Sequence, residues 1–491
     1  MSSTDAATNG GRVARNTTYL TLAFIGQRLL SSLYIPIIAG LVGPTVIGDY
    51  FTVLAFINLF TIFIDLGLTP AFIRQTARSE AEGREDLRAI MAIKLVTAAV
   101  VTMLMFLVVF ILIDRGLTHT PATFFSWAVV AMILDSMTTT MYGFFRGVQR
   151  LEFESVGTVL HRIIIMIVAF IVLQLGGPTS IIIIALVAGS TGNFLYAAFH
   201  LWRQGFSFRP HWSWPVIKRL LMLAWPFALA SLAVGIYANS DNVLLTLFNG
   251  RRVVGLYGTA SKVILAFQIL PSALVAAIYP AMSALHHKNK GGLEDVFTNS
   301  MRYLLIVAIP LMVILALLAH PIILIGWKKI WLDAVGPLRI LALGMPFLFL
   351  NFPVGYLLNA TNHQTRNTVN IALTVTLNIV ANMIFIRRYS YHSVAIISVA
   401  SSALLFSLGF WYVRKLVRVR YRYLLHTLLK TVIAGLIIAL LGRWVLPATH
   451  RLSGLIGVAM LLGATYLGLL FVLHIVEAND LQNFLKRFRR T

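Results

Sequence analysis

The chain has 491 residues, of which 58% are hydrophobic and only 12% are charged. Soluble globular proteins carry about 25% charged residues, so this composition excludes an ordinary water-soluble fold and indicates a protein that folds in lipid. The net charge of +23 would suggest nucleic acid binding in a soluble protein. Here the basic residues cluster between apolar segments, as they do in the cytoplasmic loops of membrane proteins, so we expect no nucleic acid partner.

Apolar segments long enough to cross a bilayer, which takes about 20 residues, recur along the whole chain. They predict an all-α polytopic membrane protein, because open strands would leave backbone groups unpaired in lipid. No short apolar stretch with a cleavage site precedes the first segment, so we expect no signal peptide. The segments predict about fourteen helices, near residues 17–42, 47–70, 89–113, 124–148, 154–175, 180–202, 220–248, 254–284, 301–326, 334–360, 367–386, 392–413, 424–446 and 454–475.

The positions of Lys and Arg predict the orientation of these helices. If the N-terminus is cytoplasmic, most basic residues fall in segments on the cytoplasmic side, including the run RKLVRVR at 414–420. An even number of spans then returns the C-terminus to the same side. We therefore expect a multi-pass protein of the plasma (inner) membrane with both termini in the cytoplasm.

Two stretches of the chain have nearly the same sequence: GPTVIGDYFT at 43–52 and GRRVVGLYGT at 250–259. Each lies where an outward helix ends and the next begins, six predicted helices apart. This spacing predicts two parallel six-helix repeats, an arrangement that places a transporter's substrate site between its halves. The alternative is that both stretches are merely a turn followed by a helix start. The predicted organisation is an N-terminal lobe at 1–205, a C-terminal lobe at 215–414, and two extra helices with a basic cytoplasmic tail at 423–491.

Cationic side chains inside predicted spans are costly and usually face a cavity or a partner. Arg28 lies on a polar face of the first helix, and a guanidinium matches the geometry of phosphate. It is a candidate ligand for a diphosphate or an acidic sugar, with a salt bridge to Asp65 or Asp241 as the alternative. Lys262 and Arg339 are further candidates for substrate binding, unless they only anchor their helices at the membrane interface.

Three more arginines, Arg146, Arg150 and Arg162, gather near the predicted cytoplasmic ends of the fourth and fifth helices. They are either ordinary positive-inside charge or a site that collects diphosphate headgroups from the inner leaflet. On the second reading, Arg146 and Arg162 join the substrate-binding candidates.

Carboxylates inside spans are candidates for cation coupling or gating. Asp241, in the seventh helix, could bind and release a proton or form a structural ion pair. Asp135 stands in a polar stripe of the fourth helix and is expected to line a cavity. Asp65 could close the cytoplasmic side by pairing with Arg74 or Arg146.

Pro226 and Pro271 lie inside the seventh and eighth predicted helices, where proline removes a hydrogen bond and bends the helix. They are therefore hinge candidates. Asp49, in the first turn of the second helix, is expected to be structural, because a carboxylate there favours the helix dipole. We find no phosphate-binding loop, dinucleotide motif or His-Glu-x-x-His spacing, and no cysteine. We therefore expect no enzyme, no cofactor and no metal site.

Four stretches carry a resemblance to a known family. They are the G-x-x-V-[IV]-G-x-Y turn after the first helix, DLGLTPAFIRQTAR after the second, FFRGVQRLEFESVGTV between the fourth and fifth, and residues 357–402. Through them the chain resembles the polysaccharide-transporter (Wzx-type) branch of the multidrug/oligosaccharidyl-lipid/polysaccharide flippase superfamily. It departs from the family pattern where Arg387 replaces proline, where Ser390 and His392 replace glycines, and where Asn242 replaces an arginine.

The resemblance implies a flippase that moves a polyprenyl-diphosphate-linked oligosaccharide to the outer leaflet by alternating access, coupled to H⁺ or Na⁺. Its implied partners are membrane lipids and the glycosyltransferases and polymerase of the same pathway. Three alternatives remain open. A lipid II flippase has similar cargo chemistry, whereas a multidrug/cation antiporter would favour acidic residues in the first helix. A membrane glycan polymerase or ligase would be expected to carry a large external loop.

Overall fold

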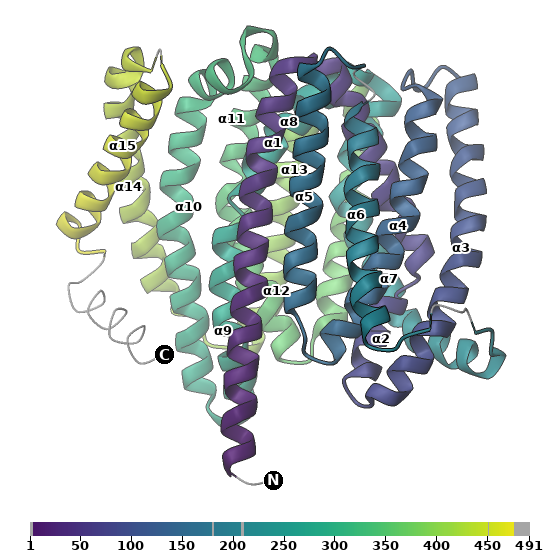
Figure 1. Ribbon diagram of the computed structural model, residues 1–491. Helices are drawn as coiled ribbons and strands as arrows, with labels where there is room; N and C mark the ends of the chain where they lie inside the picture. The colour runs from purple at the N-terminus through teal and green to yellow at the C-terminus, as the bar shows by residue number, and fades with distance from the viewer. Residues whose placement is uncertain (1–2, 179–180, 208–210, 450, 476–491) are drawn as a thin grey trace. The chain divides into compact units, whose positions relative to one another are not determined.

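The computed structural model describes residues 3–178, 181–207, 211–449 and 451–475, and the regular secondary structure of these ranges is helical (Figure 1). Within them, the side chains of residues 3–25, 28–29, 32–33, 287–288 and 448 lie outside the described part. The α-helices are α1 (Ser3–Asp65), α2 (Leu68–Thr76), α3 (Glu80–Asp114), α4 (Ala122–Gly147), α5 (Glu152–Gln174), α6 (Ile181–Arg203), α7 (Trp214–Asn249), α8 (Arg251–Ala266), α9 (Ile269–Lys288), α10 (Lys290–Trp327), α11 (Val335–Leu343), α12 (Met345–Ala360), α13 (Gln364–Leu416), α14 (Tyr421–Val445) and α15 (Leu452–Val472), with short 3₁₀ turns at Lys329–Ala334 and Leu446–Ala448.

The predicted all-α polytopic membrane fold is confirmed. Among the described residues, 11 helices are long and apolar enough to cross a membrane, or 12 if Lys329–Leu343 and Met345–Ala360, bent by 44°, form one span. The sequence predicted about fourteen because it counts two spans in each of α1 and α13, where the structure has two helices joined across a non-helical residue. This residue is Gly43 in α1 and Ser390 in the 53-residue α13.

The chain divides into two compact units: Met1–Gly258 with Ile386–Ser390, and Thr259–Phe385 with Tyr391–Thr491. The division falls inside α8 rather than in the polar stretch at 203–219, because α7 packs against α1, α2 and α3. Arg219 of α7, for example, donates a hydrogen bond of 2.5 Å to the buried Asp86 of α3. The lobes at 1–205, 215–414 and 423–491 were defined by the predicted repeat, and that division of the chain stays a prediction.

Helices α4, α5 and α6 form the centre of the first unit, with α1 packed against α4 and α5 and with α3 against α4 (Figure 1). Phenylalanines pack together at the end of this unit that is predicted to face the cytoplasm. Phe72, Phe144 and Phe145 are fully buried, and the ring centroids of Phe144 and Phe206 lie 4.6 Å apart in an edge-to-face contact. Such dense packing holds membrane helices together, because lipid supplies little hydrophobic driving force between them.

The first glycines of the two similar sequence stretches have nearly the same backbone conformation. Gly43 has φ 80° and ψ 172°, and Gly250, which ends α7, has φ 83° and ψ 174°. Side chains disfavour this region, so glycine suits it best. Contacts between the stretches are reciprocal as well: a methyl group on Gly48 would lie 1.7 Å from the carbonyl oxygen of Arg251, and one on Gly255 would lie 2.0 Å from that of Pro44. Two locally equivalent turns thus pack against each other, while the repeat of whole six-helix units stays a prediction.

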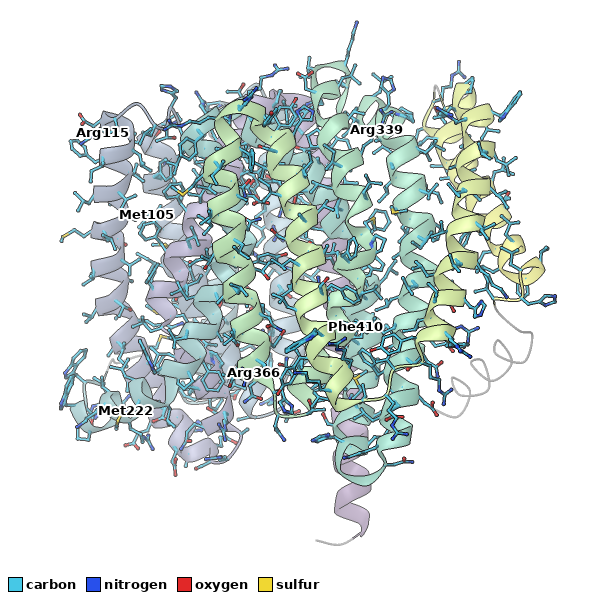
Figure 2. The ribbon with its side chains drawn as sticks, turned by 180° about the vertical axis from the view of Figure 1, so that it is seen from behind. Met105, Arg115, Met222, Arg339, Arg366 and Phe410 are labelled. Carbon is cyan, nitrogen blue, oxygen red and sulfur yellow. The ribbon has the colours of Figure 1, made fainter. Side chains whose placement is uncertain are left out.

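In the second unit, α10 is the central helix and packs against α9, α11, α12, α14 and α15. The hydroxyl of Tyr466 on α15 donates a 2.9 Å hydrogen bond to the Ile306 carbonyl of α10, which fixes the C-terminal helix pair to this core. Near the end of α13, Phe410 stacks on Phe406 at 5.3 Å, and Arg366 from the start of the same element lies 5.8 Å from the Tyr412 ring (Figure 2).

Candidate functional site

Polar side chains from four helices meet inside the first unit, near the middle of the membrane-spanning helices α4 and α5. Arg162 follows the start of the 23-residue α5 by ten positions, or about 15 Å of helix, and Asp135 lies midway along α4. Charges at this depth are costly and usually functional. We call the group the Arg162 cluster; its members are Tyr34, Tyr50, Asp135, His161, Arg162 and Ser190.

The guanidinium of Arg162 holds the cluster together. It donates a hydrogen bond to the hydroxyl of Tyr50 and interacts electrostatically with the carboxylate of Asp135. Its Nε is buried and has no hydrogen-bond partner among the described residues. The hydroxyl of Tyr34, a residue only 4% exposed, likewise has no described hydrogen-bond partner and lies within electrostatic range of Arg162. A buried donor without a partner costs about 1–3 kcal/mol, so both groups favour the arrival of an acceptor.

Neutral hydrogen-bonding groups surround the carboxylate end of the cluster. Ser190 donates to Asp135, and its Oγ lies 3.5 Å from Nε2 of His161. Beside them the hydroxyl of Tyr142 donates a 2.6 Å hydrogen bond to Oδ1 of Asn193. The cluster therefore contains one guanidinium and one carboxylate, with neutral hydrogen-bonding groups around the carboxylate.

The structure corrects the expected position of Arg162, which does not gather with Arg146 and Arg150 near the helix ends. Arg146, in the last turn of α4, forms a bidentate ion pair with Glu154, with 2.6 Å from Nε to Oε2. Arg150 lies 3.4 Å from a carboxylate oxygen of Glu152. The two outer arginines thus have local acidic partners, whereas Arg162 lies at mid-span. Arg162 lies well inside the apolar stretch at 154–175, and this position was the sequence signal that could have distinguished it from Arg146 and Arg150.

Asp65 pairs with Lys94 instead of with Arg74 or Arg146. The side chain of Lys94 is completely buried, and its Nζ lies 2.6 Å from Oδ1 of Asp65 and 3.1 Å from the carbonyl oxygen of Ser136. Sequence reasoning overlooked Lys94, although its position inside the predicted span at 89–113 was a usable signal. This pair ties the end of α1 to α3 and α4.

Asp241 and Asp49 both bind residues of α8, close to the turn at Gly250. Asp241 accepts a 2.5 Å hydrogen bond from the hydroxyl of Tyr257 on α8. Asp49 accepts from Nε of Arg251 at 2.5 Å, from a second nitrogen of the same guanidinium, and from Thr120 at 2.8 Å. These contacts agree with the structural role expected of Asp49.

The remaining candidates include exposed side chains and one side chain outside the described part of the chain. Arg339 on α11 (Figure 2) and Lys262 on α8 are exposed, and the side chain of Arg28 lies outside the described residues. Pro226 lies in α7 between two alanines whose backbone touches Gly67, at the break between α1 and α2. Pro271 follows the break between α8 and α9, which its missing N–H helps to explain. Their role as hinges stays a prediction.

Within the described part of the chain, no group of three or more His, Asp or Glu side chains could hold a metal ion.

Comparison with known families gives one match over more than half of the chain. A family model described as "polysaccharide biosynthesis protein" matches residues 13–286. The chain is also similar to an uncharacterised membrane protein of Methanocaldococcus jannaschii, with 26% identity over 183 residues. That match takes in 36% of this chain and 35% of the relative, so the similarity spans about a third of the relative's length.

Solved structures with the same fold include two kinds of transporter. Lipid II flippase MurJ, in an inward closed conformation, superposes with a TM-score of 0.72 and 15% identity, over 94% of this chain and 99% of that one. A multidrug resistance MATE family transporter of the MOP superfamily, in an inward-facing conformation, gives 0.63 and 15%, over 81% and 95%. A MOP superfamily transporter from Pyrococcus furiosus gives 0.56 and 14%, over 82% and 96%. At these identities the likeness establishes the fold.

Proposed function

Because the chain belongs to the polysaccharide biosynthesis protein family, we propose that it is a flippase for a polyprenyl-diphosphate-linked oligosaccharide. It would carry this precursor from the cytoplasmic to the outer leaflet of the plasma membrane by alternating access. The proposed activity is transport and breaks no covalent bond. Both termini would then lie in the cytoplasm, and the glycosyltransferases and polymerase of the pathway would supply and consume the cargo.

One observation carries the proposal: a guanidinium at mid-membrane whose Nε is buried without a described partner. Arginine presents five donors in a fork that suits phosphate oxygens. The hydroxyls of Tyr34 and Tyr50 add neutral donors beside it. An anionic diphosphate would gain hydrogen bonds here that an organic cation could not accept.

The same geometry supports coupling to a cation. In the cluster as it stands, Asp135 balances the charge of Arg162. A diphosphate that binds Arg162 would take away this partner and leave a carboxylate at mid-membrane, which is costly unless it binds H⁺ or Na⁺. Asp135 would thus be the residue that binds the coupling cation during the transport cycle. Asp241 stays a second candidate for this role, and Arg28, Lys262 and Arg339 stay candidates for contacts elsewhere on the cargo path.

The experiment that tests the proposal locates the cargo in cells depleted of the protein. Polyprenyl-linked glycans are identified by mass spectrometry, and externally added glycosidase reports which leaflet holds them. We expect complete lipid-linked oligosaccharide to accumulate where the enzyme cannot reach it. Re-expressed Arg162→Met should leave this block in place and Arg162→Lys should relieve part of it.

Arg115→Met is the matched control, because Arg115 is an exposed residue just after α3 (Figure 2). It should restore normal transport. Normal outer-leaflet delivery in depleted cells, together with raised drug sensitivity, would overturn the proposal in favour of a multidrug antiporter. Lipid II trapped inside would replace the proposed cargo by that lipid.

A further inference from the structure

An apolar cavity of about 300 Å³ lies between α1 and α5, which pack side by side in the first unit (Figure 1). This volume is at the lower end of the range of small-molecule sites, roughly 300–1,000 Å³. We call it the α1–α5 groove; it is lined by Tyr34, Ile37, Ile38, Met166, Ile167 and Phe170. Ile37, Ile167 and Phe170 are 45%, 50% and 45% exposed within membrane-spanning helices, so the groove opens on an apolar face of the first unit.

Tyr34 joins the groove to the Arg162 cluster. The residue lines the groove, yet its hydroxyl is buried, lies within electrostatic range of Arg162 and Tyr50, and has no hydrogen-bond partner in the described chain. One end of the site is therefore hydrocarbon-like and the other offers hydrogen-bond donors beside a cation. A ligand that fills both must carry an anionic group directly on an apolar chain.

The depth of the site distinguishes between possible lipids. The hydrocarbon core is about 30 Å thick, so a group at mid-span lies about 15 Å from either headgroup layer. An ordinary phospholipid keeps its phosphate at the surface and would place only acyl chain at this depth. A lipid whose phosphate is drawn into the membrane, as in a flippase cargo in transit, would bring phosphate and chain together there.

We propose that the α1–α5 groove holds the first isoprenoid units of the polyprenyl cargo while its diphosphate binds Arg162 and the hydroxyl of Tyr34. This assignment rests on the proposed function. It places the tail against the outside of the first unit, so that the chain stays in lipid contact during transport and only the polar head needs an internal path.

The purified full-length protein in phosphatidylcholine nanodiscs allows a direct test, with farnesyl diphosphate carrying a diazirine on its first isoprene unit as the probe. After illumination, labelled peptides should contain residues 34–38 and 166–170. Ile167→Trp should lower this labelling about tenfold by filling the groove, and Phe170→Trp should do the same. Ile111→Trp is the matched control, because Ile111 is a lipid-exposed isoleucine of α3 (46% exposed), and it should leave labelling unchanged.

The headgroup part is tested by two comparisons. Arg162→Met should reduce labelling by the diphosphate probe to the level given by the corresponding farnesol probe. A photoreactive phosphatidylcholine should label the lipid-facing helices without preference for the groove.

The groove assignment is wrong if the farnesyl diphosphate probe labels all lipid-facing helices evenly, or if neither tryptophan variant lowers its labelling. It is also wrong if the photoreactive phosphatidylcholine labels the groove with the same preference as the diphosphate probe. Those results leave the proposed function standing if depleted cells still trap the cargo inside. Conversely, specific labelling without trapped cargo supports the groove as an isoprenoid diphosphate site and overturns the flippase.

Discussion

Asp49 and Arg251 form a bidentate ion pair although 202 positions separate them in the chain. Asp49 is completely buried, and Thr120 adds a third hydrogen bond to its carboxylate. Each residue belongs to one of the two similar sequence stretches, directly beside the close contact of Gly48 with the Arg251 backbone. A side-chain pair and a backbone contact thus hold the same two turns together.

Breaking this ion pair should destabilise the protein more than reversing it. Asp49→Asn leaves the guanidinium of Arg251, 28% exposed, without its counter-charge, at a cost of about 3 kcal/mol. The double variant Asp49→Arg/Arg251→Asp restores opposite charges and should recover most of the loss. Thermal unfolding in detergent, followed by tryptophan fluorescence, measures the difference. A double variant no more stable than the sum of its single changes would show that the pair contributes nothing of its own.

Adding a methyl group at Gly48 or Gly255 should force the two turns apart. The added carbon would meet a backbone carbonyl at 1.7 Å or 2.0 Å, and backbone cannot rotate away as a side chain can, so each Ala variant should lose at least about 3 kcal/mol. Gly463→Ala on α15 is the control, because nothing lies within 4 Å of its added carbon, and it should be neutral or slightly stabilising. Equal unfolding temperatures for Gly48→Ala and Gly463→Ala would contradict the close contact.

Much of this fold could be predicted, because its signals are local. The apolar spans follow from composition, and the shared turn follows from Gly43 and Gly250, which adopt nearly the same φ and ψ. The partners of charged residues could not be predicted, because they depend on which helices become neighbours. Asp65 pairs with Lys94 rather than with Arg74. Arg162 interacts with Asp135 and Tyr50 rather than lying beside the outer arginines.

Ser390→Gly should stabilise the chain. Ser390 breaks α13 with φ 52° and ψ −142°, a region costly for any residue with a side chain, by about 1–3 kcal/mol. Glycine removes this strain and loses part of the gain, about 0.5–1 kcal/mol, through its greater freedom when unfolded. We expect a net gain of about 1 kcal/mol, seen as a higher unfolding temperature. Ser407→Gly, at an exposed helical site of the same element, should instead lower stability by about 0.5 kcal/mol.

The buried pair of Lys94 and Asp65 should behave as a unit in a double-mutant cycle. Lys94→Met leaves the carboxylate of Asp65 without its cation and should cost about 3–5 kcal/mol, whereas Lys94→Met/Asp65→Leu removes both charges and should be nearly neutral. Chemical or thermal unfolding of the four proteins gives the coupling free energy. If the double variant is the least stable of the four, hydrogen bonding by Lys94 to Ser136 and Thr69 outweighs the ion pair.

The exchange of partners proposed for Arg162 makes opposite predictions for binding and for transport. Asp135→Asn removes the carboxylate that competes with a diphosphate for the guanidinium, so binding of farnesyl diphosphate to the purified protein should tighten by about tenfold. Transport should nevertheless fall, because the amide cannot bind the coupling cation. Outer-leaflet delivery in cells should become slow and insensitive to collapse of the ion gradient. Arg162→Met should instead lose both binding and transport. If Asp135→Asn binds the diphosphate no more tightly than the unsubstituted protein, the carboxylate and the cargo do not share the guanidinium, and coupling must reside in another carboxylate such as Asp241.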